Sequence, residues 1–193
     1  ENTFFIFVND HGEGLSIAPH KTDGHGSDLY PGNMDVPWIV RGPKIPAGHE
    51  INGLVSQIDF TPTMMGLLDL PPDENPLSGV NLADQLLGDS SPSSRQFAFA
   101  ASFFFGADIA ALFTSDRQCQ RDYGSSPSPK IADGCFYRSG PKKFGKRIPP
   151  EGMLEQLDGF RASLLEKHAS WDTQELLPDE DLNEQLKALG YVE

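Results

Sequence analysis

The 193-residue chain has few basic residues and no long hydrophobic run. Lys and Arg number 15 against 28 Asp and Glu, which gives a formal net charge of −13. This balance argues against nucleic acid as a partner, because phosphate contacts require Lys and Arg. The apolar run from Phe97 to Phe105 is far shorter than the roughly 20 residues that a membrane helix needs. We therefore expect a globular chain with no membrane span and no nucleic-acid partner.

Cysteine is scarce as well. The two cysteines, Cys119 and Cys135, flank a segment rich in Ser, Pro and Gly. A disulfide between them would close that loop and stabilise the fold by about 3 kcal/mol in the chain-entropy model. It would also imply an oxidising, extracytoplasmic compartment. Two buried, unpaired thiols are the alternative.

The sequence also lacks any motif that identifies a catalytic nucleophile. It holds no Gly-x-Ser-x-Gly elbow, no phosphate-cradling glycine loop with Lys, and no second acidic pair to complete a metal site. The chain begins at Glu1, two residues before an apolar run, with no Met. We expect a mature chain or a fragment that lacks a leader or more.

Apolar runs and turn residues along the chain predict an α/β fold. The predicted elements are strands at 3–8 and 36–40, an extended piece at 54–56, helices from 59 to 70 and 80 to 87, a hairpin at 96–104 and 108–114, a strand at 135–137, a helix from 151, and a last helix near 179–189. Residues 1–90 would form part of a parallel sheet with flanking helices. Residues 91–193 would form a small antiparallel α+β part with a helical tail.

A polar cluster follows the first predicted strand. Asp10 and His11 come directly after the apolar residues, and His25 lies fourteen residues further on between two glycines. Adjacent strand residues point to opposite faces, so Asp10 and His11 can reach one ion only where the backbone turns, which Gly12 permits. Carboxylate and imidazole together suit a divalent metal ion. The alternative is that these residues form a turn or a helix cap in which the His ring makes ordinary hydrogen bonds within the protein.

Other polar residues are weaker candidates. His20 competes with His25 in the same loop, and Glu13 could orient an imidazole. Lys21 and Arg41 could meet an anionic substrate. We interpret the remaining histidines, His49 and His168, as structural, and the basic run at 142–147 as a solvated loop.

The order of these motifs resembles the alkaline phosphatase superfamily. It is similar to the carboxyl-terminal half of sulfatases and of type I phosphodiesterases. The matching pieces are Asp-His-Gly at 10–12, Gly-His-Gly at 24–26, Val-Pro-Trp-Ile-Val-Arg-Gly-Pro at 36–43, Ile-Pro-Ala-Gly-His-Glu-Ile at 45–51, Asp-Phe-Thr-Pro-Thr at 59–63, and the tail at 186–192. The resemblance implies a partial alkaline-phosphatase-like sheet and a metal-dependent hydrolase of small anionic sulfate or phosphate esters.

The resemblance also implies roles for individual residues. Asp10 and His11 would ligate the divalent metal, with Ca, Zn and Mn not distinguished, and His25 would be a third ligand or a proton donor to the leaving group. The family's nucleophile lies in an amino-terminal half that these residues do not include. Many sulfatases carry Lys at the position of Gly26, whereas His25 beside it is more like the phosphodiesterases. Sulfate and phosphate esters therefore both stay open.

Three hypotheses follow from the sequence. The first is a sulfatase-like hydrolase, or a phosphodiesterase-like or phosphatase-like one, of which this chain carries part of the site and is inactive alone. The second is a truncated homologue that acts as a binding module. The third is an unrelated α/β domain with structural histidines. Under the first, removal of the amino-terminal half would expose the strand at 3–8 and make the chain poorly soluble by itself.

Overall fold

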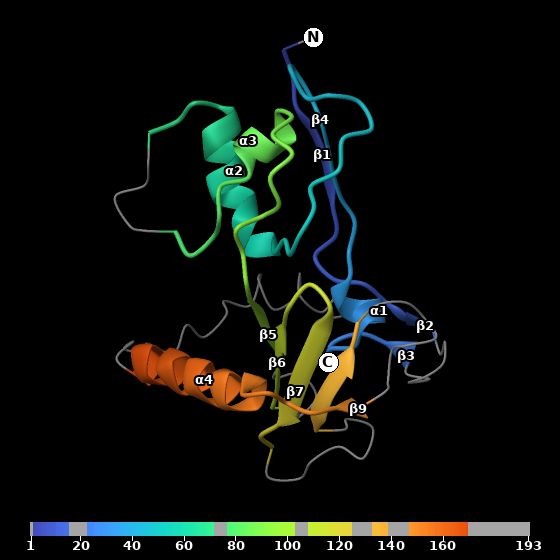
Figure 1. Ribbon diagram of the computed structural model, residues 1–193, viewed down its shortest axis with the longest axis vertical. Helices are drawn as coiled ribbons and strands as arrows, with labels where there is room; N and C mark the ends of the chain where they lie inside the picture. The colour runs from blue at the N-terminus through green and yellow to red at the C-terminus, as the bar shows by residue number, and fades with distance from the viewer. Residues whose placement is uncertain are drawn as a thin grey trace, which may run out of the picture. The chain divides into compact units, whose positions relative to one another are not determined.

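A computed structural model describes residues 2–15, 23–71, 77–102, 108–124, 133–138 and 147–169 (Figure 1). Its elements are β1 (Phe5–Val8), β2 (Gly14–Leu15), β3 (Asp23–Gly24), α1 (Pro31–Met34), β4 (Trp38–Arg41), the 3-10 helix η1 (Gln57–Asp59), α2 (Phe60–Leu67), α3 (Ala83–Leu86), β5 (Ala98–Ser102), β6 (Ile109–Phe113), β7 (Arg117–Asp122), β8 (Gly134–Tyr137), β9 (Arg147–Ile148) and α4 (Met153–Ala169). Backbone contacts divide the chain into two units, Glu1–Asp158 and Gly159–Glu193.

The α/β class is confirmed, and the predicted helices from 59, 80 and 151 correspond to α2, α3 and α4. The last predicted helix, near 179–189, lies outside the described residues. The extended piece predicted at 54–56 forms no strand. The predicted boundary near residue 90 stays a prediction. No helix among the described residues is long and apolar enough to cross a membrane.

The first two predicted strands pair with each other, but not as expected. Strands β1 and β4 form an antiparallel two-stranded ribbon in which Phe7 lies opposite Ile39. All strand pairs in the described part of the chain are antiparallel, so the prediction of a parallel sheet is wrong for these residues. A parallel pair needs a crossover, usually a helix of several turns, and among the described residues between β1 and β4 the short α1 is the only helix.

The prediction that the first strand is buried on both faces is also wrong for this chain. Phe5 is 69% exposed and Phe7 is 58% exposed, on the same side of β1. Ile39 beside them on β4 is 60% exposed. The other side of the ribbon meets α2, where the rings of Trp38 and Phe60 lie 6.0 Å apart. The ribbon therefore has one packed face and one bare apolar face.

The predicted hairpin at 96–114 is confirmed and belongs to a five-stranded antiparallel sheet in the order β5-β6-β7-β8-β9 (Figure 1). All of β6 is buried, because its side chains alternate between two hydrophobic clusters. One cluster holds Ala110 and Leu112 together with Met153 and Leu157 of α4. The other holds Ile109, Ala111 and Phe113, with Leu29 packed against them. The helix start and the segment around Leu29 thus cover opposite faces of the sheet.

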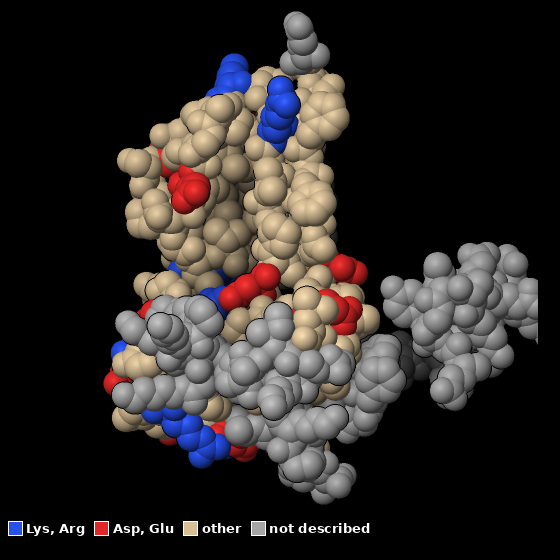
Figure 2. Space-filling model, turned by 90° about the vertical axis from the view of Figure 1, so that its right-hand side faces the viewer, with Lys and Arg blue, Asp and Glu red and all other residues tan. Residues whose placement is uncertain are grey.

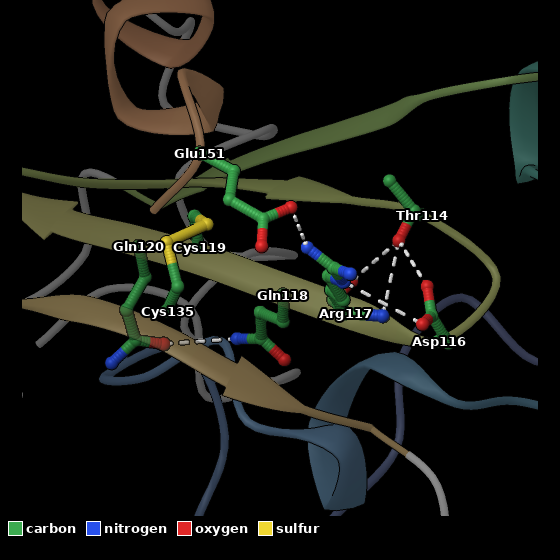
Figure 3. Close-up of a disulfide and its surroundings, with 8 residues drawn as sticks. All are labelled: Thr114, Asp116, Arg117, Gln118, Cys119, Gln120, Cys135 and Glu151. Carbon is green, nitrogen blue, oxygen red and sulfur yellow. Dashed lines mark hydrogen bonds and ion pairs between the residues drawn. A yellow bond between two sulfur atoms is a disulfide. The ribbon is translucent and has the colours of Figure 1, made fainter. Parts of the chain in front are cut away.

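The two cysteines form a disulfide that joins β7 to β8 (Figure 3). Cys119 and Cys135 are direct partners in the strand register, and both are buried in the cluster beneath α4. Figure 3 shows Gln118 and Gln120 pointing to the opposite side of β7, as strand alternation requires. The disulfide therefore closes the loop between residues separated by 16 positions, which is the first of the two alternatives that the sequence leaves open.

Loss of this disulfide should lower stability. Replacing Cys119 and Cys135 together by Ala should reduce the free energy of unfolding by about 3 kcal/mol, because a short loop is released in the unfolded chain. Urea unfolding with and without a reductant provides the measurement. Reductant should lower the unfolding midpoint of the wild type and leave that of the variant unchanged. Equal midpoints for the oxidised wild type and the variant would contradict the assignment.

A buried ion pair holds the segment around α2 together. Asp59 is completely buried, and its carboxylate accepts hydrogen bonds from the backbone N–H groups of Ser56 (2.9 Å) and Val80 (2.7 Å). Arg95 donates from Nε to the same carboxylate at 3.0 Å and pairs with it again through Nη2. One carboxylate thus connects three segments distant in sequence and orients the start of α2.

Candidate functional site

The end of β1 is held in place by contacts from other parts of the chain. The side-chain Nε2 of Gln57, at the start of η1, donates to the carbonyl oxygens of Asn9 and Asp10, each at 2.6 Å. Gly12 donates its N–H to the carbonyl of Asn33 at 2.8 Å. A Cβ atom at Gly12 would lie 2.0 Å from the carbonyl oxygen of Gly32, so the close approach requires glycine. This turn brings Asp10 and His11 to the surface.

Asp10 and His11 present their donor atoms side by side. The backbone N–H of His11 donates to Asp10 Oδ1 at 2.9 Å, and His11 Nδ1 lies 2.8 Å from the carbonyl of Gly12. Since a carbonyl only accepts, Nδ1 carries the proton and Nε2 is left with a lone pair. His11 Nε2 then lies 3.6 Å from Asp10 Oδ2. Donor atoms about 2.1 to 2.5 Å from one divalent ion are separated by roughly 3 to 4 Å, so this pair fits a shared metal ion.

The carboxyl of Asp10 is well suited to bind a cation. The hydrogen bond from the His11 backbone N–H lowers the pKa of Asp10 below its ordinary value, and the nearby His11 and His25 rings act in the same direction. A carboxylate with a lowered pKa stays ionised, and able to ligate a metal, at lower pH than an ordinary aspartate. The Asp10 side chain is 81% exposed, so a ligand from outside these residues can reach it.

His25 lies against the same cluster. Its ring stacks on that of His11, with centroids 4.1 Å apart and planes inclined by 26°. Its Nδ1 lies 3.2 Å from Glu13 Oε2. The short β2–β3 ribbon produces this contact, because Gly14 pairs with Gly24 and the next positions along the register are Glu13 and His25.

The predicted residues thus lie together, but they do not converge on a single point. Within the part of the chain that the structure describes, no three His, Cys, Asp or Glu side chains form a group that could hold a metal ion. The competing candidates His20 and Lys21, and the side chain of His168, lie outside the described residues. A cleft of about 1480 Å³ is lined by residues that include Val8, Gln57 and His49, but not by Asp10, His11 or His25.

Two residues that shape the candidate site, Gln57 and Glu13, could not be ranked highly from the sequence. Gln57 holds the end of β1 from 47 and 48 positions away, and nothing local in the sequence indicates that contact. Glu13 was a weak candidate, but it is the side chain that pairs with His25. The glycines at 14 and 24 are the one feature of the sequence that indicates this pairing, because small residues let the two short strands meet closely.

Comparison with known proteins shows which family the first part of the chain resembles. Residues 1–70 match the family model described as Sulfatase, a range that includes the Asp10, His11 and His25 cluster. Arylsulfatase K of Gallus gallus is 34% identical over 142 residues, which cover 69% of this chain and 26% of that protein. These matches support the alkaline phosphatase-like sulfatase superfamily for this chain. The resemblance inferred from the motifs is therefore confirmed.

Solved structures with the sulfatase-like fold extend the similarity beyond residue 70. A protein crystallised in complex with its substrate, D-glucosamine-2-N,6-O-disulfate, superimposes with a TM-score of 0.61 at 17% identity, over 90% of this chain and 36% of that one. A phosphonate monoester hydrolase from Silicibacter pomeroyi gives 0.59 at 19% identity, over 86% and 34%. The chain spans about a quarter or less of the curated relatives that it matches first.

Proposed function

We propose that this chain contributes one side of the active site of a metal-dependent sulfate ester hydrolase. The observation that carries the proposal is the 3.6 Å separation of Asp10 Oδ2 and His11 Nε2 at the end of β1. Both atoms are available to a ligand, because the His11 tautomer is fixed by the Gly12 carbonyl. In this proposal Asp10 and His11 hold a divalent cation, and His25 is a proton donor or a third ligand.

The chemistry divides between the cation and the side chains. A cation bound there would offset negative charge on an ester oxygen and make a nucleophile more acidic. Asp10 supplies a carboxylate that remains charged, and His11 supplies a neutral nitrogen on a fixed ring. The nucleophile comes from outside these 193 residues, because the sequence has no motif for one. A small anionic sulfate ester is the proposed substrate class.

The placement of His25 supports proton transfer better than metal ligation. Its ring stacks on His11 instead of pointing at the same position, and Glu13 pairs with its Nδ1. The opposite nitrogen, Nε2, is then the atom from which a proton can pass to the leaving oxygen as the ester bond breaks. The side chain is half exposed, so a substrate can approach it.

Phosphate-type esters are the second candidate substrate class. The fold similarity to a phosphonate monoester hydrolase supports it, as does Gly26 at the position where many sulfatases carry Lys. An assay of the protein expressed from its complete gene separates the classes. The enzyme would be supplied with an aryl sulfate, an aryl phosphate and an aryl phosphodiester, with and without a chelator. Chelator-sensitive turnover that is fastest on the sulfate is expected.

Other outcomes of this assay decide between the remaining hypotheses. Faster turnover of either phosphate ester would replace the sulfate assignment. No turnover of any ester, by a folded protein that retains metal, would favour the binding-module hypothesis.

The disulfide between Cys119 and Cys135 supports an extracytoplasmic location, because such bonds persist in oxidising compartments.

We further propose that the bare face of the β1–β4 ribbon is covered by an amino-terminal half that supplies the nucleophile. Figure 2 shows few charged side chains over this part of the molecule. Phe5, Phe7 and Ile39 are all more than half exposed there. Adjacent exposed apolar side chains on a two-stranded ribbon favour association with another chain or segment.

The 193 residues expressed alone should therefore self-associate. Replacing Phe7 by Lys should shift the sedimentation distribution toward monomer, because a charge interrupts the bare face. Leu68→Lys is the matched control, since Leu68, the residue after α2, is 55% exposed and Phe7 is 58% exposed. A wild-type chain that sediments as a monomer and unfolds in a single cooperative transition would contradict the proposal of a covered face.

A further inference from the structure

We propose that Glu13 is the positioning residue for His25, holding its ring so that Nε2 is the nitrogen that gives and takes a proton. This inference rests on the proposed proton-donor role of His25. It adds a residue whose function the metal site does not require. The evidence is the pairing of Glu13 Oε2 with His25 Nδ1 at 3.2 Å.

The backbone explains why these two side chains meet. In the β2–β3 ribbon Leu15 lies opposite Asp23 and Gly14 lies opposite Gly24. One further step along this antiparallel register places Glu13 opposite His25. Directly opposed residues on an antiparallel pair have neighbouring side chains on one face. The end of the β2–β3 ladder thus brings the two residues together, and their half-exposed side chains meet through Oε2 and Nδ1.

Glu13 and His11 constrain His25 from two sides. The His11 ring stacks on the His25 ring at 4.1 Å, and the Glu13 carboxylate meets its edge. Both flanking glycines have φ near +80°, a conformation that favours glycine, so the loop around His25 is shaped by the backbone.

The hydrogen bond between His25 and Glu13 determines which ring nitrogen of His25 carries a proton. A carboxylate can only accept, so Nδ1 of His25 must be the donor to Glu13. In the imidazolium form Nε2 carries the transferable proton, which passes to the leaving ester oxygen. In the neutral form that follows, the remaining proton stays on Nδ1. A neutral imidazole without such a partner carries its proton mainly on Nε2, so the tautomer reports directly on Glu13.

The test is the neutral tautomer of His25, measured by nitrogen-15 NMR of histidine-labelled protein expressed from its complete gene. The pH is raised until the His25 resonances no longer change, so that the neutral form is observed, and His25→Gln identifies the resonance. The wild type should carry the proton on Nδ1, and Glu13→Ala should move it to Nε2. Glu13→Gln should retain it on Nδ1, because the amide oxygen can still accept. Glu155→Ala, which removes an exposed acidic residue of α4, should change nothing.

Activity gives a second readout. Glu13→Ala should lower kcat by about 10- to 100-fold with little change in KM, and Glu13→Gln should restore most of the loss. A wild-type tautomer on Nε2, or a tautomer unchanged by Glu13→Ala, would overturn the inference. The wild-type spectrum decides this even if a variant fails to fold. An enzyme that hydrolyses no ester would instead count against the proposed function, since the tautomer is read without turnover.

Discussion

Replacing Asp10 and His11 together by Ala should lower kcat/KM of the protein expressed from its complete gene by about 1000-fold or more. Electrostatic stabilisation by a bound metal ion contributes several kcal/mol to such reactions, and each 1.4 kcal/mol corresponds to a tenfold change in rate. Both donor atoms of the pair, Asp10 Oδ2 and His11 Nε2, are lost at once. Steady-state kinetics on the best ester substrate provides the measurement.

A matched double variant controls for the loss of one carboxylate and one imidazole. Asp84 is an exposed residue of α3, and His49 is a half-buried residue that follows the turn at 47–48, outside the cluster. Replacing both by Ala should leave kcat/KM within a few-fold of the wild type. Similar losses in the two double variants, or full activity in the Asp10 and His11 variant, would contradict the assignment of the metal site.

Replacing Arg95 by Met should lower the free energy of unfolding by about 3 to 5 kcal/mol, since it leaves a buried carboxylate without its charge partner. Asp59 is fully buried and the Arg95 side chain is 10% exposed. The two hydrogen bonds that Asp59 accepts from backbone N–H groups would remain, but they do not neutralise its charge. Urea unfolding followed by circular dichroism measures the change.

The pair between Arg117 and Glu151 is the control for this experiment. Glu151 is 60% exposed, and exposed ion pairs contribute little because water screens them. Glu151→Ala should therefore leave the unfolding curve unchanged. If Arg95→Met were as mild as Glu151→Ala, the Asp59 network could not be what holds this region together.

Local sequence patterns were enough to predict several elements of the fold. Apolar runs located β1, β4 and the β5–β6 hairpin, and Asp59 with Pro62 located the start of α2. Strand β7 was missed, because its sequence Arg-Gln-Cys-Gln-Arg-Asp is polar although its centre is buried. Gln118 is accommodated there by donating to the carbonyl of Leu29 and to Gln120. Those partners depend on tertiary packing, so no local pattern reveals them.

The environment of β1 could not be predicted from its own sequence. A continuous apolar run is typical of a strand that is buried on both faces. Among the described residues only one face of the ribbon is covered, by α2, whose Phe60 lies against Trp38 of β4. The run therefore predicts the surface that needs covering and not which chain segment covers it.

The candidate site was predictable in part. The position of Asp10 and His11 beside each other at the end of β1 could be predicted, because an apolar strand ends directly before them; their role as metal ligands stays a prediction. The contact between Glu13 and His25 could not be predicted. It depends on the register of β2 against β3, and no apolar pattern specifies that register in a loop so rich in glycine.

The most direct test of the account is the metal content of the protein expressed from its complete gene and purified without chelators. Elemental analysis would compare the wild type, the Asp10 and His11 double Ala variant, and the Asp84 and His49 control. We predict stoichiometric divalent metal in the wild type and the control, and little or none in the Asp10 and His11 variant. Equal metal content in all three proteins, or no metal in a catalytically active wild type, would contradict the claim that Asp10 and His11 form a metal site.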